Sequence, residues 1–272
     1  MKIDLHNHTK YSDGLFSPEE LIKIAISQNV DCFALTDHDS VAGCDEIQEI
    51  SKNYNIKVIS GMELSTYYKG KSVHIVCLFP NNKVPEGLIE YTKNMKNERD
   101  QRAIQMMKNI ESIYGLKVDI DKLFSGDGVI TRANMLYNIA ECNNMTHKEV
   151  EPYISNDSKA YIPSTKLDVR DGIEMAKECG CLTILAHPCL LPKEYAVEIA
   201  KMGVDGIEVR YPSNATGDEQ FFSKLADEIG LLKSGGSDFH GDDGSKHAMI
   251  GTSTIDENMF KPIKERLGLE WK

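Results

Sequence analysis

The chain has 272 residues, of which 41% are hydrophobic and 27% charged, and its formal net charge is −11. This is the composition of a globular protein that is long enough to bury a core. The acidic balance argues against a surface that coats nucleic acid, so we expect no stable DNA binding, although bound cations could reverse the local field and admit a small anionic substrate.

The start of the chain carries Lys2, Asp4 and His6 where a signal peptide would be apolar, so we expect no secretory signal. No apolar run approaches the length of a membrane span. The seven cysteines lack CxxC spacing, and reduced thiols in a cytosolic protein are the simplest interpretation. We therefore expect a cytoplasmic protein that makes no membrane contact.

The first third of the chain alternates short apolar strands with amphipathic helices. A helix is predicted over 17–29, because Ser17, Pro18 and Glu20 form a helix start with a capping box. A second helix is predicted over 40–54. The strands of this part are predicted near residues 2–5, 32–36, 56–60 and 73–79.

Residues 84–160 have a charged, helical pattern. Strand and helix then alternate again, and three further strands are predicted near residues 182–186, 206–210 and 231–234. Such alternation implies parallel strands joined by crossover helices, and the apolar strand interiors fit a sheet that is buried on both faces. The sequence thus predicts an α/β fold of seven strands, with residues 84–160 inserted between the fourth and the fifth.

Side chains that can bind metal ions fall at the ends of these strands. They are His6, His8, Asp13, His38, Glu63, His74, His187, Asp238 and His240. The carboxyl ends of the parallel strands of a barrel meet at one edge, which is where active sites form. The segments HNH and SDFH each place two of these residues two positions apart, so both side chains of a pair can face one pocket.

The chemistry of this set indicates divalent cations. Imidazole and carboxylate ligands without thiolate suit Zn, Mn or Fe. Each residue alone has a plainer explanation, since a lone His74 in an apolar strand is usually a hydrogen-bonded core histidine. The nine together exceed what one ion needs, so we predict two or three divalent metal ions, with Mn, Zn and Fe as the open choices.

In this order, the segments HNH, TDHD, GMELS, AHP and SDFH resemble the motifs of the PHP superfamily, the polymerase and histidinol phosphatase proteins. The resemblance runs through essentially the whole chain. It is closest to the stand-alone branch of 3′,5′-nucleotide bisphosphate phosphatases and 5′→3′ exoribonucleases, which carries a helical insertion at the same place. It implies a distorted (β/α)7 barrel formed by residues 1–83 and 161–272, with residues 84–160 as a helical cap.

The resemblance also implies three metal ions and a set of ligands for each. The first ion would take His6, His8, Glu63 and Asp238. The second would take Asp13, His38 and His240. The third would take His74 and His187, with Glu63 bridging it to the first. One departure follows the sixth strand, where the branch has a histidine and this chain has Asn214, so the substrate need not be that of the bisphosphate enzymes.

We predict that the chain hydrolyses phosphate monoesters with a metal-bound hydroxide that is held by the same ligands. Clustered divalent ions lower the pKa of a bound water and stabilise the negative charge that develops on the phosphate. The expected substrates are small phosphorylated molecules of nucleotide type, such as nucleoside 3′,5′-bisphosphates or AMP, and short RNA is a further candidate.

Two arginines are expected to bind the phosphate, because a guanidinium group can hold two phosphate oxygens at once. Arg132 matches an arginine at a helix start in the insertion of the branch. Arg210 ends the sixth strand and should point toward the rim of the pocket. Either could instead be a surface ion-pair partner.

Other charged residues are left outside the predicted site. The run NERDQR, which contains Arg99 and Arg102, is interpreted as a solvated helix face. Asp37 and Asp39 flank His38 and could orient it, although exposed turn residues are the simpler interpretation.

Several alternative functions stay open. A histidinol-phosphate-type phosphatase or an oligoribonucleotide 5′→3′ exonuclease would use the same barrel. A C–N hydrolase of the amidohydrolase type also opens with HxH, but it typically bridges its metals with a lysine, whereas Glu63 is the bridging candidate here. A non-catalytic, metal-stabilised module that binds nucleotides is the last alternative.

Overall fold

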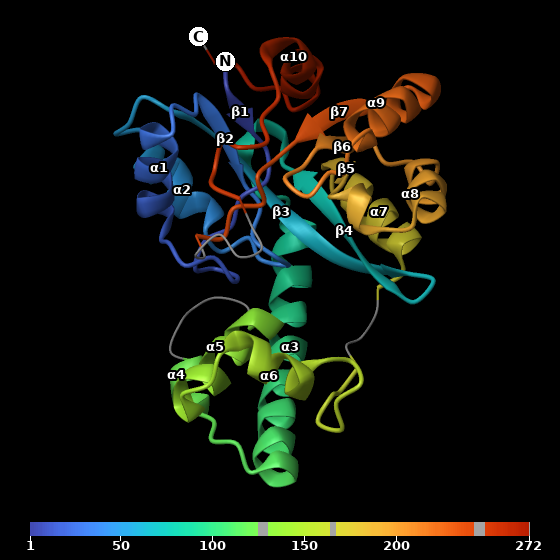
Figure 1. The fold of residues 1–272 in the computed structure, drawn as a ribbon. Helices are drawn as coiled ribbons and strands as arrows, with labels where there is room; N and C mark the ends of the chain where they lie inside the picture. The colour runs from blue at the N-terminus through green and yellow to red at the C-terminus, as the bar shows by residue number, and fades with distance from the viewer. Residues whose placement is uncertain (125–129, 164–166, 242–247, 272) are drawn as a thin grey trace.

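The strands of this computed structural model, which describes residues 1–124, 130–163, 167–241 and 248–271, form a single sheet (Figure 1). It contains seven strands in the order β1-β2-β3-β4-β5-β6-β7. They are β1 (Ile3–Asp4), β2 (Cys32–Leu35), β3 (Lys57–Tyr68), β4 (Lys71–Leu78), β5 (Leu182–Leu185), β6 (Gly206–Arg210) and β7 (Leu232–Gly235). The sheet curves until its ends meet, since the Leu5 amide donates to the Gly235 carbonyl at 3.0 Å. The predicted distorted seven-stranded α/β barrel is confirmed.

One strand departs from the predicted parallel arrangement. β4 runs antiparallel to both β3 and β5. Lys69 and Gly70 join β3 to β4 and have φ angles of 44° and 87°, as a tight two-residue hairpin requires. Because no crossover helix separates the two strands, the chain must reverse. The start of β4, including His74, therefore lies at the same edge as the carboxyl ends of the other strands.

Helices pack around the outside of the barrel (Figure 1). They are α1 (Pro18–Ser27), α2 (Cys44–Ser51), α7 (Val169–Glu178), α8 (Lys193–Ala200), α9 (Asp218–Ile229) and α10 (Glu257–Arg266), with short 3₁₀ turns η1 (Pro80–Asn82) and η2 (Pro188–Leu190). α1 begins with the predicted capping box, in which the Ser17 amide donates to the Glu20 carboxylate at 2.8 Å. Among the described residues no helix is both long and apolar enough to cross a membrane.

The interior of the barrel is apolar at the end that faces α10. Side chains of the first five strands meet there with the underside of α10, and all are buried: Ile3, Cys32, Ile59, Val76, Ile184 and Phe260. All seven cysteines are free, four of them buried and three half-buried, and none is joined in a disulfide. The polar strand ends occupy the opposite end of the barrel.

The segment between β4 and β5 forms a helical lobe beyond the barrel (Figure 1). Its elements are α3 (Glu86–Tyr114), α4 (Ile120–Leu123), α5 (Arg132–Asn143) and α6 (His147–Ile154). The long helix α3 leaves the barrel and carries the lobe, which has an apolar core of its own built around Met106, Ile110 and Ile139. Its helices, from Glu86 to Ile154, lie within the stretch 84–160 that the sequence pattern sets apart; that this stretch is a separate unit acting as a cap is a proposal developed below.

Candidate metal centre

Nine side chains from six strands or the loops after them converge at the edge of the barrel that faces the lobe. His6, His8 and Asp13 follow β1, His38 follows β2, His74 lies in β4, His187 follows β5, and Asp238 and His240 follow β7. Glu63 lies within β3 and not after it as expected, because pairing with β4 extends β3 to Tyr68. All nine residues predicted from the sequence as ligands are thus brought together.

Glu63 is the centre of this cluster and is fully buried. Its two oxygens lie 2.9–3.2 Å from one ring nitrogen of each of five histidines, namely His6, His8, His38, His74 and His187. A single carboxylate therefore contacts five histidines that come from four different strands or the loops after them.

Two aspartates complete the cluster on either side of His8. Asp238 Oδ1 lies 3.1 Å from His8 Nε2 and 3.4 Å from His6 Nε2. Asp13 Oδ1 lies 3.1 Å from His240 Nε2. The hydroxyl of Tyr211 donates to the other Asp238 oxygen at 2.8 Å, a contact that sequence patterns do not indicate.

Three groups of these side chains have ligand atoms close enough to share an ion. The first is His6, His8, Glu63 and Asp238; the second is His8, Asp13, His38 and His240; the third is His38, Glu63 and His74. The first group equals the set that the family resemblance implies. The second adds His8, and the third contains His38 where His187 was expected, although His187 Nε2 lies 2.9 Å from Glu63 Oε1.

The distances between the donor atoms match those expected for ligands that surround one metal ion. Atoms of the first group are 3.1–3.4 Å apart, and ligands bound to one ion at about 2.0–2.2 Å are separated by about 3.0–3.5 Å. Four of these buried atoms make no hydrogen bond within the described residues: His6 Nε2, His8 Nε2, Glu63 Oε2 and Asp238 Oδ1. Buried polar atoms without partners are costly, and a divalent cation would satisfy all four. The residues present therefore fit divalent metal ions.

Charge reinforces this fit. Burial lowers the pKa of His6, but the nearby carboxylates of Glu63, Asp238 and Glu208 outweigh it and hold that pKa well above its ordinary value. Burial raises the pKa of Glu63, but His38 and the other surrounding histidines outweigh it and hold that pKa well below its ordinary value. The buried carboxylates thus favour positive charge at this site, as the binding of cations requires.

Asp37 and Asp39 are buried, so the interpretation as exposed turn residues is wrong. Asp37 accepts a hydrogen bond of 2.6 Å from the Ser12 hydroxyl, which in turn lies 3.4 Å from His8 Nδ1. Asp39 accepts from the Ser65 amide at 2.8 Å and forms an ion pair with Arg99 of α3. Both carboxylates therefore support the loops that carry the candidate ligands.

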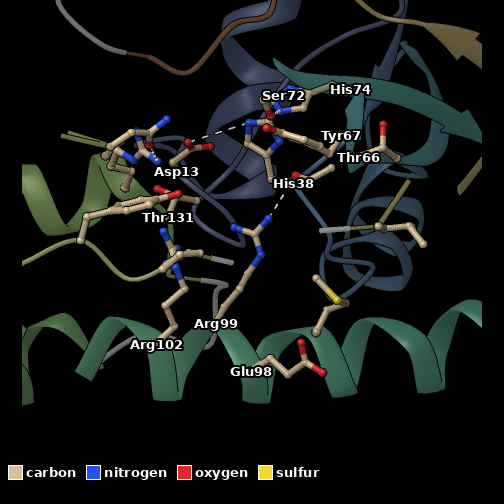
Figure 2. Close-up of a pocket in the computed structure, with 18 of the residues that line it drawn as sticks. Asp13, His38, Thr66, Tyr67, Ser72, His74, Glu98, Arg99, Arg102 and Thr131 are labelled. Atoms are coloured by element: carbon tan, nitrogen blue, oxygen red, sulfur yellow. Dashed lines mark hydrogen bonds and ion pairs between the residues drawn. The ribbon is translucent and has the colours of Figure 1, made fainter. Parts of the chain in front are cut away.

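A pocket of about 470 Å³ opens between this cluster and the helical lobe. On the barrel side it is lined by Asp13, His38 and His74, and on the lobe side by Arg99, Arg102 and Arg132. Figure 2 shows Arg99 and Arg102 extending from α3 toward Asp13 and His38. The pocket thus has candidate metal ligands on one wall and three guanidinium groups on the other.

Arg99 and Arg102 belong to NERDQR, so the interpretation of this run as a solvated face is wrong for these two residues. Arg99 Nη2 donates to the Ser65 hydroxyl at 3.0 Å, and Arg102 Nε donates to the Ile162 carbonyl at 2.7 Å. The two arginines are three positions apart and so share one face of α3, a spacing that could have singled them out.

Arg132 lines the pocket from the start of α5. Its Nη2 donates to Asn156 Oδ1 at 3.0 Å, and its guanidinium carbon lies 5.6 Å from the centre of the Tyr161 ring. Arg102 lies 5.5 Å from the same ring. One aromatic ring, that of Tyr161, thus contacts two of the three cations.

Arg210 does not line this pocket, contrary to expectation. Its Nε pairs with Glu219 of α9 at 2.7 Å and its Nη1 donates to the Thr254 carbonyl at 3.0 Å. The register of β6 against β7 shifts between Glu208 and Arg210. Because this irregularity breaks the alternation of faces along β6, Arg210 need not follow Glu208 toward the centre. Asn214 Nδ2 donates to the Val209 carbonyl at 2.8 Å and so holds the loop after β6.

Comparison with known proteins gives matches along nearly the whole chain. The sequence profile of the PHP domain matches residues 4–94. The chain is 30% identical over 252 residues to a 5′-3′ exoribonuclease of Haemophilus influenzae, covering 88% of this chain and 90% of the relative. It is 27% identical over 248 residues to a 3′,5′-nucleoside bisphosphate phosphatase of Chromobacterium violaceum, covering 88% and 87%. A solved structure from Bifidobacterium adolescentis shares the fold, with a TM-score of 0.86 at 24% identity over 97% of this chain and 96% of that one.

Proposed function

The chain belongs to the PHP family and is a phosphoesterase, and we propose that its substrates are nucleotides that carry two phosphates on one ribose. One observation carries this proposal. The pocket has candidate metal ligands on its barrel wall and three arginines on its lobe wall. One phosphate group does not need both walls, whereas a substrate with two phosphates can use them together.

The barrel wall would hold the metal ions, two or three in number. The candidate ligands are the nine residues His6, His8, Asp13, His38, Glu63, His74, His187, Asp238 and His240. When bound, divalent ions supply a water of lowered pKa and a positive charge opposite the phosphate oxygens. No protein nucleophile is then required, and the residues of the chain need only position the scissile phosphate.

The lobe wall would bind the rest of the substrate. Arg99, Arg102 and Arg132 offer planar forks that suit phosphate oxygens. Each is already oriented by protein groups: Arg99 donates to Ser65 and pairs with Asp39, Arg102 donates to the Ile162 carbonyl, and Arg132 donates to Asn156. Asp39 offsets the charge of Arg99, whereas the guanidinium groups of Arg102 and Arg132 share the pocket and repel each other, and an anion between them relieves this repulsion. The lobe would thereby act as the cap.

A second candidate activity, 5′→3′ exoribonuclease, has its own support, because a relative of that name is 30% identical over 88% of this chain. The terminal nucleotide of a 5′-phosphorylated RNA also carries phosphate at both its 5′ and 3′ oxygens. The same two walls could therefore hold either substrate. The two activities differ in the bond broken, which is a monoester in one case and a diester in the other.

The amidohydrolase alternative lacks its usual feature here. Glu63, which contacts five histidines, would take the bridging position, and no lysine is found among the described residues that line the pocket.

The test is a phosphate-release screen of the Mn²⁺-loaded chain. Its substrates are adenosine 3′,5′-bisphosphate, AMP, histidinol phosphate and a 5′-phosphorylated RNA of three to five nucleotides, with product analysis for the RNA. We expect kcat/KM for the bisphosphate or the RNA to exceed that for AMP by at least about tenfold, which corresponds to about 1.4 kcal/mol. Equal rates on AMP and the bisphosphate, without RNA cleavage, would contradict the proposed role of the arginine wall.

A further inference from the structure

Glu208 is a buried carboxylate that lies beside the candidate metal centre without belonging to any of its three groups. It sits on β6, and only 2% of its surface is exposed. A carboxylate buried this completely needs hydrogen-bond donors around it. One backbone donor and one histidine ring, from different strand ends, face this carboxylate.

The first donor is the backbone of His187. Its amide donates to Glu208 Oε2 at 2.7 Å. His187 has φ 28° and ψ 56°, a backbone conformation that is unfavourable for a residue other than glycine and persists only where its surroundings hold it. The ring of His187 then places its Nε2 2.9 Å from Glu63 Oε1. Glu208 thus helps to hold one candidate ligand through its main chain.

The second group is the ring of His6, whose buried Nδ1 faces Glu208 but completes no hydrogen bond among the described residues. Its Nδ1 lies 3.4 Å from Glu208 Oε1. Gly236 packs against this pair, and a Cβ at that position would lie 2.2 Å from the His6 Cβ and 3.0 Å from Glu208 Oε1. Only glycine allows the two side chains to approach here.

The two nitrogens of His6 therefore have different tasks. Nδ1 faces Glu208, whereas Nε2 lies 3.1 Å from Glu63 Oε2 and 3.4 Å from Asp238 Oδ1. A carboxylate can only accept, so the proton of a neutral His6 ring belongs on Nδ1. Nε2 is then left with a free electron pair directed at the point where a cation fits, which is the usual arrangement of a metal-binding histidine.

We propose that Glu208 is a positioning residue that fixes the Nδ1–H tautomer of His6 and the backbone of His187. It would thereby couple two candidate ligands that both contact Glu63. The inference rests on the proposed metal centre, but it concerns how the ligands are held and not which substrate is hydrolysed.

Glutamine at position 208 cannot replace both interactions. Its single carbonyl oxygen can accept from the His187 amide, but its NH₂ group then faces His6 Nδ1. The His187 backbone amide can only donate, so it keeps the glutamine oxygen, and the glutamine NH₂ group must donate to His6 Nδ1. The proton of the His6 ring then moves to Nε2, where it opposes metal binding. Glu208→Gln therefore changes hydrogen bonding with little change in volume.

The test compares metal binding by Glu208→Gln, by Glu228→Gln and by the unmodified chain. Glu228 lies exposed on α9, where it pairs only weakly with Lys224 at 3.7 Å, and it serves as the matched control. Each metal-free protein is titrated with Zn²⁺ against a chromophoric chelator. We expect Glu208→Gln to lose about 10- to 100-fold in affinity at one or more sites and Glu228→Gln to match the unmodified chain. A folded Glu208→Gln protein with unchanged affinity and stoichiometry would overturn the inference.

A second measurement needs no folded variant at position 208. Long-range ¹H–¹⁵N correlation spectra of the Zn²⁺-loaded unmodified chain report the tautomer of each histidine, and His6→Asn assigns the signal of His6. We expect a proton on Nδ1 of His6, and a proton on Nε2 would overturn the inference. If the unmodified chain itself fails to bind Zn²⁺ and to release phosphate, the proposed function fails; if it does both and Glu208→Gln behaves identically, only the present inference fails.

Discussion

Arg99 of α3 and Asp39 of the loop after β2 form an ion pair that joins the helical lobe to the candidate metal centre. Asp39 follows His38 directly and is fully buried, and its other oxygen accepts from the Ser65 amide at 2.8 Å. The position of the lobe is therefore coupled to a loop that carries a candidate ligand. This coupling makes Arg99 the first residue to test.

Replacing Arg99 by alanine should reduce kcat/KM for a bisphosphate substrate by about 10- to 100-fold, or about 1.4–2.7 kcal/mol. The change removes a phosphate-binding fork and leaves the Asp39 charge buried without its partner. Arg99→Lys should recover part of this loss, because lysine keeps the charge but not the planar fork. Steady-state kinetics provide the measurement, with Arg170→Ala on the exposed face of α7 as control. Unchanged kinetics for Arg99→Ala would exclude Arg99 from the pocket's function.

Replacing Arg132, which begins α5, and Arg210, which ends β6, should have different effects on KM. Arg132→Ala should raise KM for the bisphosphate by about tenfold, because a charge-assisted contact to phosphate contributes about 1.5–3 kcal/mol. Arg210→Ala should leave KM within about twofold, since Arg210 pairs with Glu219 at 2.7 Å away from the pocket. Both KM values come from the same phosphate-release assay. The reverse pattern would mean that the substrate lies on the other side of the cluster.

Removal of metal should abolish activity and lower thermal stability together. Ligands that bind only the folded state at about 100 times their Kd stabilise it by about 2.7 kcal/mol. For a chain of this size that corresponds to a fall in Tm of about 5–10 °C after exhaustive chelation. Scanning calorimetry and metal analysis before and after readdition of Mn²⁺ check this expectation. Full activity in a preparation shown to be free of metal would contradict the metal-dependent mechanism.

Asp205, at the opposite end of the barrel, should contribute stability that depends on pH. Burial raises its pKa, but hydrogen bonds from Thr183 and the ion pair with Lys177 outweigh this and hold the pKa below its ordinary value of 3.8. Since the unfolded chain then binds a proton more readily than the folded one, the contribution is present above about pH 4 and is lost as the pH falls through the lowered pKa.

Asp205→Asn should therefore cost about 1–3 kcal/mol in the free energy of unfolding near neutral pH, and the difference from the unmodified chain should shrink below the ordinary pKa of 3.8. Urea unfolding followed by circular dichroism between pH 7 and pH 3 measures it. Phosphate release at neutral pH should be unaffected by this variant. A difference in stability that stays constant over the whole pH range would show that the charge of Asp205 is not what stabilises the fold.

The candidate ligands could be predicted from the sequence because each depends on a local rule. A strand places its last side chains at one edge of the sheet, and residues two positions apart share a face. The positions of the histidines and the aspartate in the HNH and SDFH segments can therefore be predicted without knowing which strands lie beside them. The helix start at Ser17 is local in the same sense, since its capping box is complete within four residues. The order of these segments along the chain then indicated the family and, through it, the expected grouping of the ligands.

Other features depend on contacts between segments that are distant in the chain. The direction of β4 follows from its hairpin with β3, and it places His74 beside Glu63. In the sequence, Arg99 and Arg102 resemble surface charges, and only the position of α3 over the barrel mouth shows that they line the pocket. Arg210 is the opposite case, because the sequence suggests a pocket residue whereas its contacts with α9 and the Thr254 carbonyl hold it outside the pocket.

The sequence by itself therefore determined which side chains can bind metal and at which strand ends they stand, because the period of a strand and the identity of a ligand are local properties. Only the tertiary structure decided which of these side chains contact each other and which neighbouring residues hold them in place. Glu63 contacts five histidines, and Glu208 lies against His6, which is 202 positions away from it in the chain, and against His187. Closing the barrel brings such residues together, and local propensity carries no information over such a separation.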